Sequence, residues 1–122
     1  MPPRLLVHVL GLCNVVAGAL VAFGPGLLMP GADGLGTTAA RVFGGSLGAF
    51  LAGSAVGAWL MPSGARRPYL WVFGVGVKVV AAALWGTLAV SSGITQLWSG
   101  AVVDLAVAAL VTTSLMRHES QA

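Results

Sequence analysis

The chain has 122 residues, of which 57% are hydrophobic and only 7% are charged, and its formal net charge at pH 7 is +3. Soluble domains are about one-quarter charged, so this composition, with a mean hydropathy of +0.95, excludes a water-soluble globular domain. A basic balance can indicate a nucleic-acid partner, but the six basic residues are better explained as signals of membrane orientation. The sequence therefore predicts an integral membrane protein that binds no nucleic acid.

Four apolar stretches predict four transmembrane helices. They cover residues 5–23, 39–61, 68–90 and 97–116. Crossing a hydrocarbon core of about 30 Å takes about 20 residues in a helix, and each stretch is close to that length. The connections are rich in Gly, Pro and Ser, which interrupt helices, and all but residues 24–40 are short. Because short connections favour antiparallel neighbours, we expect an all-α fold, a single domain 1–122 forming an up-down four-helix bundle.

The stretch from Arg41 to Met61 holds two ladders of small residues spaced four apart, which lie on adjacent strips of a helix. The first ladder is Gly44, Gly48 and Ala52, and the second is Gly45, Ala49, Gly53 and Gly57. Small residues let membrane helices approach closely and pack. The pattern predicts that the other helices pack against this one, although Gly and Ala are also common in membrane helices without such a role.

The basic residues predict the orientation. Arg4, Arg66, Arg67 and Arg117 all fall on one side of the predicted membrane, and Arg41 falls on the other. Cytoplasmic loops carry an excess of Lys and Arg. Both termini are therefore predicted to be cytoplasmic.

Three polar side chains fall at similar depth inside the predicted spans. Asn14 and Lys78 each lie about 15 Å from the inner end of their helices, and Asp104 lies about 11 Å from the outer end, at 1.5 Å per residue. Both charged residues have small residues four positions away, which indicates an inward face. We expect the three to meet, with Ser46 or Ser54 nearby, either as a structural pair between helices or as a proton, ion or headgroup site.

Asp33 and Arg41 form a candidate site at the outer interface. Arg41 opens the second span, and Asp33 lies in the connection before it. An arginine at this place commonly extends its charged end to the interface. The alternative is that Arg41 binds a lipid headgroup or a partner carboxylate together with Asp33.

The sequence offers no catalytic or metal-binding set. His8 and His118 lie at the cytoplasmic side at different levels, which does not favour haem ligation. Two His and Cys13 at unrelated spacing do not make a zinc site. No nucleophile and base pair is visible, so we expect no catalytic residue, no metal and no cofactor.

The whole-chain pattern resembles the DoxX-like small bacterial membrane proteins. The resemblance rests on four short helices, a Gly-Pro break after the first, Arg41 opening a glycine-rich second helix, and the basic pair Arg66-Arg67 before the third. It implies a four-helix protein of the bacterial inner membrane, and some members are subunits of quinone-linked oxidoreductases. No residue of this chain matches an active-site motif of the family.

These observations favour a non-catalytic subunit or scaffold that works by helix packing, with membrane lipid and a second copy or a larger membrane complex as partners. The alternative is a small proton- or ion-coupled carrier that uses Lys78, Asp104 and Asn14. A quinone- or lipid-binding redox subunit is a third hypothesis. A wide cavity reaching Lys78 and Asp104 would favour transport, and a dry packed pair would favour a scaffold.

Overall fold

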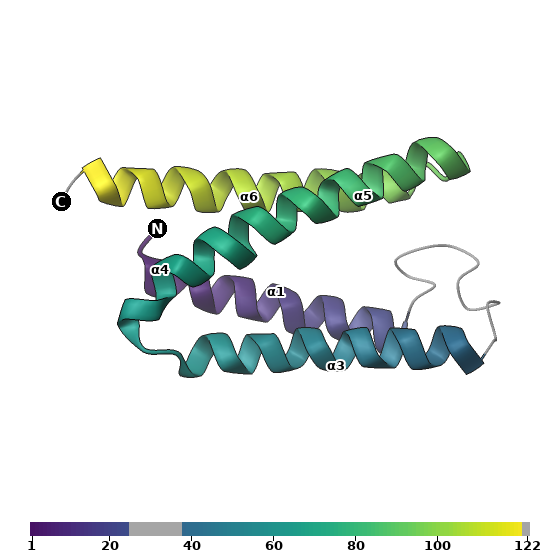
Figure 1. Cartoon of the computed structure of the whole chain (residues 1–122), viewed down its shortest axis with the longest axis horizontal. Coiled ribbons are helices and arrows are strands. Elements are labelled where there is room, and N and C mark those ends of the chain that lie inside the picture. The colour runs from purple at the N-terminus through teal and green to yellow at the C-terminus, as the bar shows by residue number, and fades with distance from the viewer. Residues whose placement is uncertain (25–37, 121–122) are drawn as a thin grey trace. The chain divides into compact units, whose positions relative to one another are not determined.

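The structure is a computed structural model that describes residues 1–24 and 38–120. Within these ranges every element is helical (Figure 1). In chain order the elements are α1 (Pro3–Phe23), α3 (Thr38–Leu60), η2 (Ser63–Ala65), α4 (Arg66–Tyr69), η3 (Leu70–Gly76), α5 (Val77–Ser92) and α6 (Leu97–Ser120). The predicted all-α class is confirmed.

Among residues 1–24 and 38–120, three helices are long and apolar enough to cross a membrane. They are Pro3–Phe23, Ser63–Ser92 and Leu97–Ser120, and α3 contributes a shorter apolar helix, Gly44–Leu60. The finding supports a membrane protein. The fourth span over residues 39–61 stays a prediction.

The helix predicted over 68–90 is longer than expected and is continuous from Ser63 to Ser92. It starts with a 3₁₀ turn in which the Ala65 N–H donates to the Pro62 carbonyl oxygen at 3.0 Å. Pro68 lies in the first turn of the following α-helix, where its missing N–H removes no helical hydrogen bond. The helix therefore begins before the proline that was expected to start it.

The middle of this long helix is wound as a π-helix over Leu70–Gly76, which the sequence analysis did not predict. The Val77 N–H donates to the Val72 carbonyl oxygen, whereas in an α-helix the acceptor lies four residues back. The winding returns to α at Val77, immediately before Lys78.

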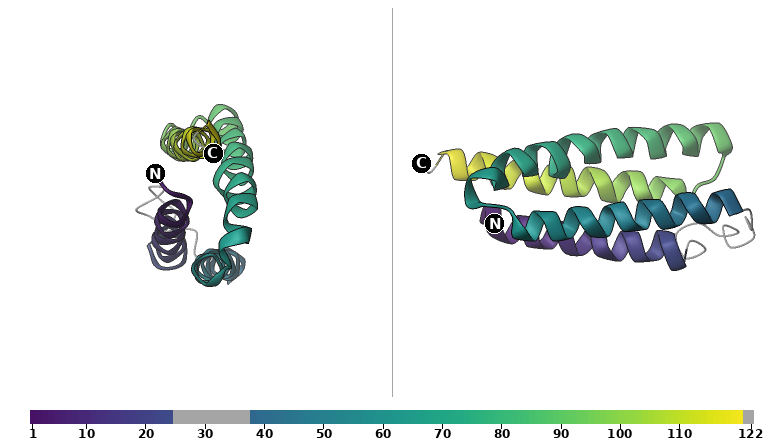
Figure 2. Two further views of the ribbon diagram at one scale, coloured as in Figure 1. Left: turned by 90° about the vertical axis from the view of Figure 1, so that its left-hand side faces the viewer. Right: turned by 60° about the horizontal axis from the view of Figure 1, so that its bottom comes forward.

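The chain divides into two compact units. The first comprises Met1–Val7 and Pro62–Ala122, and the second comprises His8–Met61. In the second unit, α1 and α3 lie side by side and antiparallel (Figures 1 and 2). Their backbones approach closely at two glycines: a Cβ on Gly18 would lie 2.8 Å from the Gly48 carbonyl oxygen, and a Cβ on Gly48 would lie 2.7 Å from that of Gly18. Because either Cβ would overlap backbone, both positions require glycine.

In the first unit, α5 and α6 pack as an antiparallel pair (Figure 2). Gly93 ends α5 with a left-handed φ of 69°, the conformation that favours glycine after a helix. Two tryptophans interlock the helices, since Trp98 lies over Gly86 and Trp85 lies over Gly100. Each glycine leaves room for an indole ring on the facing helix, and this arrangement positions the residues that lie deeper between α5 and α6.

Candidate functional site

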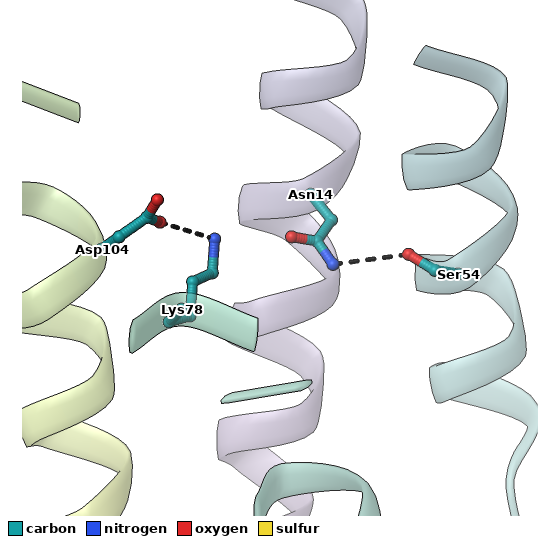
Figure 3. A network of polar contacts seen from close by, with 4 residues as sticks. All are labelled: Asn14, Ser54, Lys78 and Asp104. Atoms are coloured by element: carbon teal, nitrogen blue, oxygen red, sulfur yellow. Dashed lines mark hydrogen bonds and ion pairs between the residues drawn. The ribbon is translucent and has the colours of Figure 1, made fainter. Parts of the chain in front are cut away.

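Lys78 of α5 and Asp104 of α6 form an ion pair (Figure 3). The Lys78 Nζ donates a hydrogen bond to Asp104 Oδ1 at 2.9 Å. The two side chains are 21% and 12% exposed, respectively. The structure thus brings together the two charged residues that the sequence placed at similar depth.

Small buried residues make room for this pair. Gly74 and Ala82 lie four positions before and after Lys78, and both are buried. Ala101 and Ala108 flank Asp104 on α6 and are also buried. Isolated charges inside a bilayer cost free energy, and a partner within hydrogen-bond distance offsets part of that cost. The pair therefore links α5 to α6, and loss of either member would leave an unpaired charge.

Asn14 of α1 finds a partner on α3. Its side-chain amide donates to the Ser54 hydroxyl oxygen at 3.4 Å (Figure 3). The Ser54 hydroxyl in turn donates to the Leu51 carbonyl oxygen at 2.8 Å. Asn14 is 8% exposed, while Ser46, the other serine expected nearby, is exposed. The meeting of Asn14 with Lys78 and Asp104 stays a prediction.

The two glycine ladders of α3 differ in their surroundings. In the first ladder Gly48 packs against Gly18, and a Cβ on Gly44 would lie 3.1 Å from the Val21 carbonyl oxygen. In the second ladder Gly45, Gly53 and Gly57 have open space where a Cβ would be, as judged from the described residues. One residue turns an α-helix by about 100°, so the second ladder does not face α1. A packing role for it requires a partner outside this unit and stays a prediction.

The outer-interface candidates fall largely outside the described residues. Asp33 lies in the range 25–37, outside the part that the structure describes. Arg41 lies near the start of α3, and its side chain is outside that part as well. Their proposed contact with a lipid headgroup stays a prediction.

Two contacts near the end of α6 were missed by the sequence analysis. Arg67 forms an ion pair with Glu119, and both side chains are 49% exposed. The His118 Nε2–H donates to the Met1 carbonyl oxygen at 2.9 Å. The sequence could have indicated the ion pair, because Arg67 and Glu119 both fall on the predicted cytoplasmic side. Among residues 1–24 and 38–120, no group of three or more His, Cys, Asp or Glu could hold a metal ion.

Two open apolar grooves lie along α5. The first, of about 710 Å³, runs between α5 and α6 and is lined by Val79, Ala82, Ala83, Gly86, Thr87, Val90, Ser91, Trp98, Ala101 and Leu105. The second, of about 680 Å³, follows the π-helix and α5 and is lined by Trp71, Val72, Gly76, Val77, Val80, Ala81 and Leu84. Neither groove is lined by Lys78 or Asp104.

Comparison of the chain with protein-family models, curated proteins and solved structures finds no significant match. The resemblance to DoxX-like proteins therefore stays a prediction, and the geometry above is what bears on function.

Proposed function

We propose that the chain is a small integral membrane protein that acts as a non-catalytic subunit or scaffold of a membrane complex, through helix packing. The second ladder of α3 carries this proposal. Gly45, Ala49, Gly53 and Gly57 are exposed, and the three glycines have open space around their Cα atoms in the described part of the chain. Membrane helices associate through small residues of this kind, so the ladder offers a contact surface to another helix.

The first ladder indicates what such a surface can do. At Gly48 it lets α3 approach α1 so closely that a Cβ would lie 2.7 Å from a backbone oxygen. The second ladder has the same four-residue spacing on the same helix and therefore suits an equally close contact. A second copy of this chain is one partner that would suit it, and a larger membrane complex is the other.

The proposal includes the finer arrangement expected from the sequence. In it, four spans form an up-down bundle with both termini cytoplasmic, in the inner membrane of a bacterium, surrounded by lipid and similar to DoxX-like proteins. The excess of basic residues near one set of helix ends supports this orientation. A cysteine introduced at Ala65 should react with an impermeant reagent only from the cytoplasmic side, and labelling from outside would reverse the orientation.

A small proton- or ion-coupled carrier is the second candidate, favoured by the intramembrane pair of Lys78 and Asp104. Ionisable residues inside membrane spans often mark ion or proton pathways. Both side chains are largely buried and lie within hydrogen-bond distance of each other, which supports a structural pair. For this reason we place the scaffold first.

Native mass spectrometry after mild extraction tests the scaffold proposal. The parent should retain a second copy or another subunit, and Gly53→Leu should release this protein partner because the added side chain would hold the facing helix away. Ala106→Leu is the matched control, since Ala106 is exposed on α6. A parent that leaves the membrane with no protein partner, or a Gly53→Leu variant that keeps its partner, would contradict the proposal.

A further inference from the structure

The π-helix Leu70–Gly76 stands directly before the ion pair. It ends one residue before Val77, the first residue of α5, and Lys78 follows. π-helices are rare and are frequently found at functional sites. A segment of unusual winding thus lies between the start of the long helix and the residue that holds Asp104.

The π winding aligns the buried residues of this helix. Leu70 and Gly74 are buried, and Lys78 and Ala82 continue the same four-residue spacing. In an α-helix four residues turn by about 400°, so each step of four drifts by about 40° around the axis. A π-turn is wider, because its hydrogen bonds reach five residues back, and it removes most of that drift. Lys78 therefore shares one side of the helix with Leu70 and Gly74.

If Leu70–Gly76 were wound as an α-helix, the residues from Val77 onward would be rotated about the helix axis. An α-helix rotates further per residue than a π-helix, and over this segment the difference amounts to about one residue, or about 100°. Val77 would then stand opposite Asp104, and Lys78 would take the direction that Val79 has now. Val79 is 46% exposed and lines the groove of about 710 Å³ between α5 and α6.

We propose that Leu70–Gly76 is a register switch for the Lys78–Asp104 pair. Its π form holds the pair closed, and its α form opens the pair and turns Lys78 toward the groove between α5 and α6. The switch does not depend on the scaffold proposal, since it concerns residues of one unit and needs no partner.

Gly76 offers a way to bias the switch. A Cβ at this position would meet only the Trp71 carbonyl oxygen, at 3.6 Å, among the described atoms, so alanine fits without overlap. Glycine adapts to unusual backbone winding, whereas alanine is the strongest former of the α-helix. Gly76→Ala should therefore shift the segment toward the α form. Deletion of Val75 should instead hold the ion pair closed. Without the surplus residue the segment can wind as an α-helix while Lys78 and Gly74 stay on one side of it.

Acylation of Lys78 reports the open form, because the closed pair holds the Lys78 Nζ against Asp104 Oδ1 at 2.9 Å and so hinders the approach of an acylating reagent. Lys78 is the one lysine of the chain, so mass spectrometry after treatment with acetic anhydride follows a single side chain. The full chain is used in nanodiscs. Asp104→Asn supplies the rate for an unpaired lysine, and Gly64→Ala, which also has open space, controls for the substitution itself.

We expect Gly76→Ala to raise the acylation rate of Lys78 above the parent rate, toward that of Asp104→Asn, with Gly64→Ala at the parent rate. Deletion of Val75 should lower the rate below the parent. An unchanged or lower rate in Gly76→Ala overturns the proposal, and so does a rise that comes with a lower unfolding temperature, which would mean general loosening. If the deletion variant does not fold, Gly76→Ala alone decides.

Discussion

The contact of α1 with α3 and the contact of α5 with α6 join helices in different ways. The first brings the backbones of two glycines almost into contact and includes a neutral hydrogen bond from Asn14 to Ser54. It also places the Trp59 ring against Gly11. The second relies on an ion pair and on two indole rings that lie over glycines. Glycines make room for an indole ring in both contacts, but the close approach of two glycine backbones belongs to the first and the ion pair to the second.

This difference teaches where each contact is most sensitive. Close backbone approach leaves no space for one added carbon, so α1 and α3 should be sensitive to bulk. When one member of the ion pair is removed, the other is left as a buried charge without a partner, which costs free energy. The contact of α5 with α6 should therefore be sensitive to loss of charge. Three experiments test this contrast, taken here from the largest expected effect to the smallest.

Breaking the ion pair should have the largest effect. Lys78→Met or Asp104→Leu alone should destabilise the protein by about 3 to 5 kcal/mol, because the remaining charge is buried without its partner. The double variant should recover much of the loss, since the same reasoning makes a well-packed apolar replacement nearly neutral. Thermal unfolding in detergent measures both effects. Losses that simply add in the double variant would show that the two residues do not depend on one another.

Adding one carbon between α1 and α3 should have a smaller effect. Gly48→Ala places a Cβ 2.7 Å from the Gly18 carbonyl oxygen, and such overpacking typically costs about 1 to 3 kcal/mol. Gly53→Ala is the matched control on the same helix. No described atom of this chain would meet its Cβ, so the contact between α1 and α3 should be unaffected. The readout is again the unfolding temperature in detergent. Equal behaviour of the two variants would remove the distinction between the two ladders.

Removing the neutral hydrogen bond should have the smallest effect. The coupling between Asn14→Ala and Ser54→Ala in a double-mutant cycle should be about 0.6 kcal/mol, the average for such bonds between membrane helices. The bond is long, at 3.4 Å, which also favours a small value. A coupling as large as that of Lys78 with Asp104 would mean that the α1–α3 contact depends on polarity as much as the α5–α6 contact does.

Parts of the site could be predicted because polar residues are rare in these apolar stretches. Lys78 and Asp104 stood out as the charged residues in the middle of their spans, and helix rise placed them at similar depth. The partner of Asn14 could not be chosen between Ser46 and Ser54, since both were reasonable by position. The π-helix was not predicted from the sequence. Two glycines, Gly74 and Gly76, lie within it, but they did not distinguish it from an ordinary membrane helix.

The sequence by itself determined the helical class, the apolar stretches and the positions of small and polar residues along them. These are local properties, because they follow from composition and from the period of a single helix. Only the tertiary structure decided which ladder of α3 meets α1, which serine holds Asn14, and how the long helix is wound before Lys78. Each of these depends on the rotation of a helix about its own axis, and that rotation is set by the side chains of the facing helix, which no single stretch contains.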